Sequence, residues 1–122
     1  MEKGEYRRQL IDRTYKFSLA IMSFIDMLPK HEFSAQVLSR QLMRSGTSIG
    51  ANIVEAQASS SKRDFTNFIQ HALKSANETK YWLGLLRDSQ QASKDEAAHL
   101  LDEATELSKI LGSSILSLRG KK

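Results

Sequence analysis

Apolar side chains recur at every third or fourth position along four long segments, and this spacing limits the possible folds more than any other feature. The segments cover residues 5–28, 35–58, 62–88 and 94–118. Residues three and four apart share one face of an α-helix, so each segment is predicted to be an amphipathic helix. Nowhere does the sequence show the two-residue alternation of a half-buried strand, and we predict no β-sheet.

Serines mark the predicted starts of three helices. Ser34, Ser61 and Ser93 each precede an apolar-periodic segment, where the hydroxyl can accept a bond from an unpaired backbone N–H. An acidic residue follows Ser61 and Ser93 three positions later, where its charge suits the positive end of a helix. Pro29 is expected to end the first helix, because the residue before a proline is displaced from helical geometry.

The predicted fold is a single all-α domain over residues 1–122, an antiparallel up-down-up-down four-helix bundle. Helices of about 24 residues would be about 36 Å long, and short connectors force consecutive helices to run antiparallel. The side chains expected to face the core are Leu10, Ile11, Thr14, Tyr15, Phe17, Ile21, Met22, Phe24, Ile25, Leu28, Val37, Leu38, Leu42, Ile49, Ile53, Val54, Phe65, Ile69, Ala72, Ala76, Thr79, Leu83, Leu86, Ala97, Leu100, Leu101, Ala104, Leu107, Leu111, Ile115 and Leu118.

Composition narrows the class of protein. Hydrophobic residues make up 40% and charged residues 26%, which is typical of a folded domain and argues against disorder. The chain has no cysteine, so disulfides, thiolate metal sites and cysteine nucleophiles are excluded. The apolar run at 17–25 is shorter than the roughly 18 residues that a membrane span needs, and no cleavage pattern follows it. We expect a cytoplasmic protein without a membrane anchor.

Positive charge is unevenly distributed. The formal net charge is +4, and residues 34–54 contain Arg40 and Arg44 but no acidic residue. Further cations lie on the first predicted helix and at the C-terminus: Arg7, Arg8, Arg13, Lys16, Arg119, Lys121 and Lys122. Clustered cations gain affinity for nucleic acids by releasing counterions from phosphates. The alternative is a solvated face whose charges complement the acidic fourth helix across a contact between subunits.

Residues 46–50 formally match the G-x-S-x-G pattern of hydrolases, with Ser48 in the place of the nucleophile. That motif works on a strand-to-helix turn that exposes the serine. Here both flanks are predicted to be helical, so we reject the hydrolase interpretation. Gly46 and Gly50 each cost about 1 kcal/mol relative to alanine within a helix. We interpret them as the point where another helix approaches closely.

Two polar residues in the same segment, Asn52 and Glu55, stand among apolar neighbours, and at least one of them is expected to be partly buried. A buried polar group needs a partner. The candidates for an interhelical network with them are Arg44, Lys74, Glu78 and Lys80.

A metal or cofactor site is not expected. Di-iron bundles need two Glu-x-x-His pairs, and this chain has one, Glu96 and His99, at the start of the fourth helix. Glu55 and Glu78 could face each other as a catalytic pair, but a polar contact is the ordinary role of such residues. We predict that the chain is not an enzyme.

Three stretches, Gln41–Glu55, Ser61–Phe65 and Ala72–Leu83, resemble the small bacterial four helix bundle protein family. That family is also described as proteins encoded in intervening sequences of large-subunit ribosomal RNA, and it includes the accessory variability determinant of diversity-generating retroelements. The resemblance implies a homopentameric, barrel-like assembly that binds RNA or DNA through basic surfaces. For the retroelement branch it implies partnership with a reverse transcriptase. No catalytic residues are carried over.

The leading hypothesis is therefore a non-enzymatic oligomeric module that binds nucleic acid. Its expected phosphate contacts are Arg7, Arg8, Arg13, Arg40, Arg44, Lys62 and Arg63, and its expected structural or interface residues are Gly46, Ser48, Gly50, Asn52, Glu55 and Glu78. Arg40 and Arg44 could instead line the contact between subunits. The alternative hypothesis is a protein-interaction scaffold that binds no nucleic acid.

Overall fold

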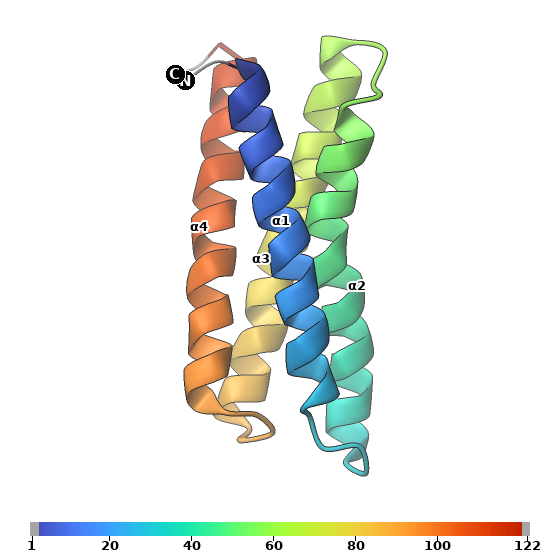
Figure 1. Cartoon of the computed structure of the whole chain (residues 1–122), viewed down its shortest axis with the longest axis vertical. Coiled ribbons are helices and arrows are strands. Elements are labelled where there is room, and N and C mark those ends of the chain that lie inside the picture. The colour runs from blue at the N-terminus through green and yellow to red at the C-terminus, as the bar shows by residue number, and fades with distance from the viewer. Residues whose placement is uncertain (1–2, 121–122) are drawn as a thin grey trace.

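The computed structural model describes residues 3–120 and consists of four helices (Figure 1). They are α1 (Lys3–Asp26), α2 (Phe33–Ala56), α3 (Lys62–Asp88) and α4 (Lys94–Leu118). Consecutive helices run in opposite directions, and both described termini lie at one end of the bundle (Figure 1). No strand occurs within residues 3–120. The antiparallel four-helix bundle predicted from the sequence is confirmed.

The predicted caps of α3 and α4 are confirmed. Ser61 Oγ accepts a hydrogen bond of 3.0 Å from the Asp64 N–H, and Ser93 Oγ accepts one of 3.3 Å from the Glu96 N–H. Each bond satisfies one of the backbone donors that a helix leaves unpaired at its start. Both helices accordingly have the predicted bounds.

The predicted cap at Ser34 is wrong. The Gln36 N–H already bonds to the Glu32 carbonyl at 3.0 Å, so α2 begins at Phe33 and Ser34 lies inside its first turn. In place of a side-chain cap, Gln36 Nε2 donates to the Lys30 carbonyl at 2.7 Å and ties the connector to the helix.

The first two helices each end two residues earlier than predicted. Residues 27 and 28 continue α1 as a turn, in which the Leu28 N–H bonds to the Ile25 carbonyl at 3.0 Å. Leu28 still reaches the core, so the apolar pattern extends past the last helical residue. At the end of α2, the amides of residues 57–59 likewise bond back in tight turns.

Most of the predicted inward positions of α1, α3 and α4 are confirmed, but Tyr15 and Met22 of α1 are wrong, since they are 65% and 43% exposed. Two positions of α2 are wrong as well. Val37 and Val54 are 36% and 53% exposed. The positions that α2 turns inward include small residues that hydrophobicity alone does not single out; its buried set is Ala35, Leu42, Ser45, Gly46, Ile49, Gly50, Ile53 and Ala56. The core face of α2 is therefore rotated away from both valines.

Glycines allow α1 and α2 to approach closely, as predicted. A Cβ on Gly46 would lie 3.0 Å from two carbons of the fully buried Ile21. A Cβ on Gly50 would lie 3.1 Å from the Oγ1 of the buried Thr14. Such distances are shorter than normal carbon contacts, so both positions must lack a side chain for the helices to pack as they do.

Buried hydroxyls fix the level at which the other helices meet. Thr79 Oγ1 donates to Ser45 Oγ at 2.9 Å, and both side chains are fully buried between α2 and α3. Ser108 Oγ of α4 lies 3.3 Å from Asn77 Oδ1 of α3. Sliding α2 along α3 by a turn would break the bond of the buried Ser45 hydroxyl, which is costly. Thr79 and Ser108 would keep their bonds to the carbonyls of Ser75 and Ala104 in their own helices. Among the described residues, no buried side-chain nitrogen or oxygen lacks a partner.

None of the helices within residues 3–120 combines the length and apolarity needed to cross a membrane.

We predict that Gly46→Leu destabilises the bundle by about 1–3 kcal/mol, because the new side chain overpacks against Ile21. Gly112→Leu is the matched control: a Cβ there meets nothing within 4 Å, and replacing a helical glycine should gain up to about 1 kcal/mol. Urea unfolding followed by circular dichroism measures both changes. Equal stabilities of the two variants would contradict the close approach of α1 and α2.

Candidate nucleic-acid interface

Four of the seven predicted phosphate contacts gather at the end of the bundle that holds both described termini. Arg7 and Arg8 lie in the first turns of α1, and Lys62 and Arg63 begin α3 at the same end (Figure 1). Arg119, which follows α4, joins them, and all five side chains are exposed. We call this group, Arg7, Arg8, Lys62, Arg63 and Arg119, the basic end. Lys121 and Lys122 of the predicted basic tail fall outside the described residues.

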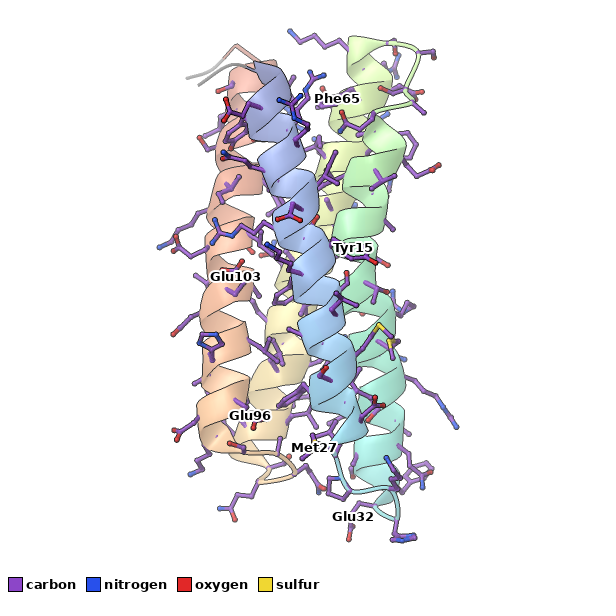
Figure 2. All side chains as sticks on the ribbon, in the orientation of Figure 1. Tyr15, Met27, Glu32, Phe65, Glu96 and Glu103 are labelled. Atoms are coloured by element: carbon purple, nitrogen blue, oxygen red, sulfur yellow. The ribbon has the colours of Figure 1, made fainter. Side chains whose placement is uncertain are left out.

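Arg13 lies farther along α1 in an ion pair that joins α1 to α4. Its Nε and Nη2 donate to the two carboxylate oxygens of Glu103 at 2.6 and 2.8 Å. This hydrogen bonding raises the pKa of Arg13 above its usual value. Glu103 lies on α4 beside α1 (Figure 2). Because the carboxylate already neutralises the guanidinium, a phosphate would have to displace it.

Arg44 forms the equivalent contact between α2 and α3. Its Nη2 donates to Glu78 Oε2, the oxygen to which Trp82 Nε1 also donates at 3.1 Å. The predicted interhelical network therefore includes Arg44 and Glu78. Arg40 is exposed one turn earlier on α2 and has no ion pair within residues 3–120.

The other members of the predicted network lie apart from it. Asn52 is half-buried and its Nδ2 donates to the Ser48 carbonyl of its own helix at 2.8 Å. Glu55 borders a groove between α1 and α2. It is eleven residues beyond Arg44, or about 16 Å along the helix, whereas Glu78 pairs with Arg44. Glu55 and Glu78 thus do not face each other as a catalytic pair.

Glu96 and His99 are both exposed near the start of α4, where they line one shallow hollow with Asp95. Within the described part of the chain, no three His, Cys, Asp or Glu side chains are grouped so that they could hold a metal ion.

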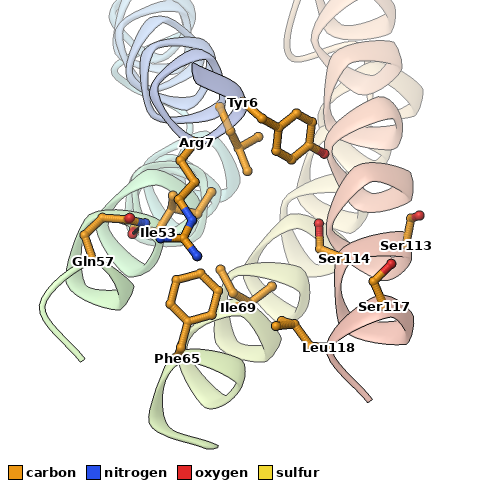
Figure 3. Close-up of a pocket in the computed structure, with 11 residues that line it drawn as sticks. Tyr6, Arg7, Ile53, Gln57, Phe65, Ile69, Ser113, Ser114, Ser117 and Leu118 are labelled. Carbon is orange, nitrogen blue, oxygen red and sulfur yellow. Dashed lines mark hydrogen bonds between the residues drawn. The ribbon is translucent and has the colours of Figure 1, made fainter. Parts of the chain in front are cut away.

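An aromatic side chain at the basic end is more exposed than the sequence predicts. Phe65 was predicted to face the core, yet it is only half-buried and lines a cavity of about 320 Å³ among all four helices (Figure 3). The Arg7 guanidinium lies over its ring, 4.9 Å from the centroid. The cavity exists because α4 turns small serines toward α1 at this level, which the pattern of one helix cannot reveal.

An exposed apolar face was also missed. Tyr15, Leu19 and Met22 recur along the outer side of α1, and Tyr15 is 65% exposed (Figure 2). Val54 on α2 shares a groove with Tyr15. We call these four side chains the apolar α1–α2 face. A run of exposed apolar side chains at helical spacing is typical of an interaction surface.

A family model described as 23S rRNA-intervening sequence protein matches residues 7–113, which includes part of all four helices. The chain belongs to the 23S rRNA-intervening sequence protein family.

A solved relative supports the same family assignment. It is a protein of unknown function from the S23 ribosomal protein family of Bacteroides thetaiotaomicron, 40% identical and with a TM-score of 0.80. The match covers 87% of this chain and 97% of that chain. No curated protein matches the sequence. The family and the fold of the chain are thus established.

We predict that Arg13 and Glu103 are coupled by about 0.5–1 kcal/mol at low salt, the range of well-formed exposed ion pairs. A double-mutant cycle with Arg13→Gln and Glu103→Gln measures the coupling from urea unfolding. It should shrink as salt is added, because both side chains are partly exposed. A coupling of zero at low salt would show that the pair does not join α1 to α4.

Proposed function

We propose that this chain is a non-enzymatic oligomeric module that binds structured RNA or DNA, with the basic end as its principal contact. The observation that carries the proposal is the gathering of five exposed cations, from α1, α3 and the residue after α4, at one end of the bundle. Three acidic residues lie at the same end, Glu5 and Asp64 in first helical turns and Glu55 in the last turn of α2, so the five cations remain in excess.

Helix polarity adds no net charge at this end, because α2 and α4 end where α1 and α3 begin, but it leaves two local sites for an anion. Both α1 and α3 begin at the basic end, and the first backbone N–H groups of a helix carry partial positive charge. Phosphates favour such positions. The ion-paired Arg13 and Arg44 are proposed to contribute less, because Glu103 and Glu78 compete with a phosphate for each guanidinium.

Assembly is the second part of the proposal. The apolar α1–α2 face would be covered by a second copy of the chain, and the family resemblance supports a homopentamer. Several copies would place several basic ends on one particle, which raises the effective concentration of each contact for a long nucleic acid. The cytoplasmic location expected from the sequence stays part of the proposal. For a member of the retroelement branch, the resemblance supports partnership with a reverse transcriptase.

We predict that the purified chain binds a structured RNA with an affinity that falls steeply between 50 and 200 mM salt, since each phosphate contact adds about 0.9 to the slope of log affinity against log salt. The double reversal Lys62→Glu with Arg63→Glu should weaken binding at least about tenfold and flatten that slope. Fluorescence anisotropy measures both quantities. Glutamates at the start of α3 are compatible with the helix dipole, so the fold should persist.

The matched control is Lys30→Glu with Lys94→Glu, which makes the same change of charge at the opposite end of the bundle. It should change the affinity about twofold or less. Salt-independent binding, or equal losses in the two double variants, would contradict the proposal.

Arg40→Glu tests the α2 surface. Weakened binding with an unchanged particle mass would assign Arg40 to the nucleic acid, and a smaller mass would assign it to the subunit contact.

The apolar α1–α2 face also favours the alternative of a scaffold that assembles without nucleic acid. We predict that Leu19→Glu with Met22→Glu reduces the particle mass measured by light scattering, because buried charges oppose assembly. Leu116→Glu on α4 is the control at a similarly exposed leucine and should leave the mass unchanged. A stable oligomer that binds neither RNA nor DNA at low salt would support the scaffold. A monomeric wild-type chain would exclude both the oligomeric nucleic-acid-binding module and the oligomeric scaffold.

A further inference from the structure

We propose that the cavity beside Phe65 is a pocket for one unstacked nucleobase, so that the basic end binds single-stranded nucleotides in preference to paired ones. This inference rests on the proposed function and assigns a ligand to part of the same surface. The ligand is a planar heteroaromatic ring that carries a phosphate, either as a free nucleotide or within a loop or end of RNA or DNA.

The space for such a ring comes from the sequence of α4. Its leucines and isoleucine at the core positions are buried, whereas the residues that line the cavity near its end include the small side chains of Ser114 and Ser117. These small side chains leave a cavity of about 320 Å³ opposite Leu10 and Phe65 (Figure 3). Ligand pockets measure about 300–1,000 Å³, so this one is suited to a ligand of nucleotide size.

The walls of the cavity match the faces of a base. Ile53 and Ile69 form an apolar floor, and Phe65 offers an aromatic surface at the side (Figure 3). The Arg7 guanidinium already lies 4.9 Å from the centre of that ring. Aromatic rings and guanidinium planes are the groups on which proteins stack unpaired bases. At 4.9 Å the two groups leave no room for a base between them, so a base would displace the guanidinium outward and then have the Phe65 ring on one face and the cation on the other.

The rim of the cavity matches the edges of a base. Gln57 lines the cavity, and its Nε2 donates to the Ile53 carbonyl, which leaves Oε1 as an acceptor. Ser114 donates to the Ile110 carbonyl and keeps an acceptor oxygen, while Ser117 and Tyr6 carry hydroxyls at the exposed side. A wholly aliphatic ligand would cover these groups without pairing them, at a cost. The rim therefore favours a ring with hydrogen-bonding edges over a fatty acyl chain.

A path for phosphates leads away from the pocket. The adjoining groove shares Arg7 and Phe65 with it and adds Lys62. A second groove continues past Lys62 to Arg63 and Arg119. A strand with one base in the cavity would thus have its neighbouring phosphates beside a row of cations. A base held in a duplex cannot reach the cavity, because its edges are paired and its faces are stacked.

The test compares single-stranded and double-stranded probes on the full chain. A fluorescein-labelled oligoadenylate of about twelve nucleotides and a blunt duplex of the same length are titrated by anisotropy. Phe65→Leu removes the ring but keeps an apolar side chain, and Ser117→Phe fills the cavity from an exposed position. Tyr81→Leu is the control, because it removes an exposed aromatic near the other end of α3. Circular dichroism and the melting temperature establish that each variant is folded.

We expect Phe65→Leu and Ser117→Phe each to weaken single-strand binding about tenfold, while duplex binding and the Tyr81→Leu control change about twofold or less. Adenosine monophosphate should shift the amide NMR signals of Tyr6, Phe65 and Ser114 in the wild type and not in Ser117→Phe. Unchanged single-strand affinity in both pocket variants would overturn the pocket, as would the absence of nucleotide-dependent shifts at the cavity.

The two proposals can fail separately. If Lys62→Glu with Arg63→Glu abolishes binding while the pocket variants bind normally, the basic end stands and the pocket is overturned. If the wild type binds no RNA or DNA but the monophosphate shifts the cavity signals and Ser117→Phe abolishes those shifts, the proposed function fails and the pocket is supported as a nucleotide site.

Discussion

The close approach of α1 and α2 is the constraint on which the rest of the structure depends. Gly46 and Gly50 let α2 pack directly against Ile21 and Thr14, and that packing turns Ser45 of α2 toward Thr79 of α3. The level of α3 against α2 is thereby fixed, and with it the position of Lys62 beside the start of α1. The charges of the basic end are thus gathered by a contact in the middle of the bundle.

The sequence predicts the fold well because its strongest signals are local. Ser61 and Ser93 sit next to the amides that they cap, and the apolar spacing of α1, α3 and α4 reports most of their buried side chains. It fails at Tyr15, Met22 and Phe65, which are exposed or half-buried. Ser34 misled the prediction because a proline-containing connector closes the first turn of α2 earlier. Val54 misled it because α2 uses glycine and serine as core residues, which hydrophobicity does not single out.

The candidate site was less predictable because its features join distant parts of the chain. Arg13 and Glu103 are ninety residues apart, and nothing near Arg13 in the sequence shows that a carboxylate will neutralise it. The cavity beside Phe65 is lined by serines of α4, whose side chains are too small to fill the space between the helices. That space is visible only when all four helices are in place. The sequence shows where the cations cluster along the chain. Only the three-dimensional structure shows which of them form the basic end and which two, Arg13 and Arg44, are held in interhelical ion pairs.

Cross-linking of bound RNA to the chain, followed by mass spectrometry of the peptides, tests the central claim most directly. If RNA binds at the basic end, cross-links are expected in the first turns of α1 and α3, with Phe65 or Tyr6 among the modified residues. Cross-links confined to the residues around Arg40, or to the acidic start of α4, would contradict it.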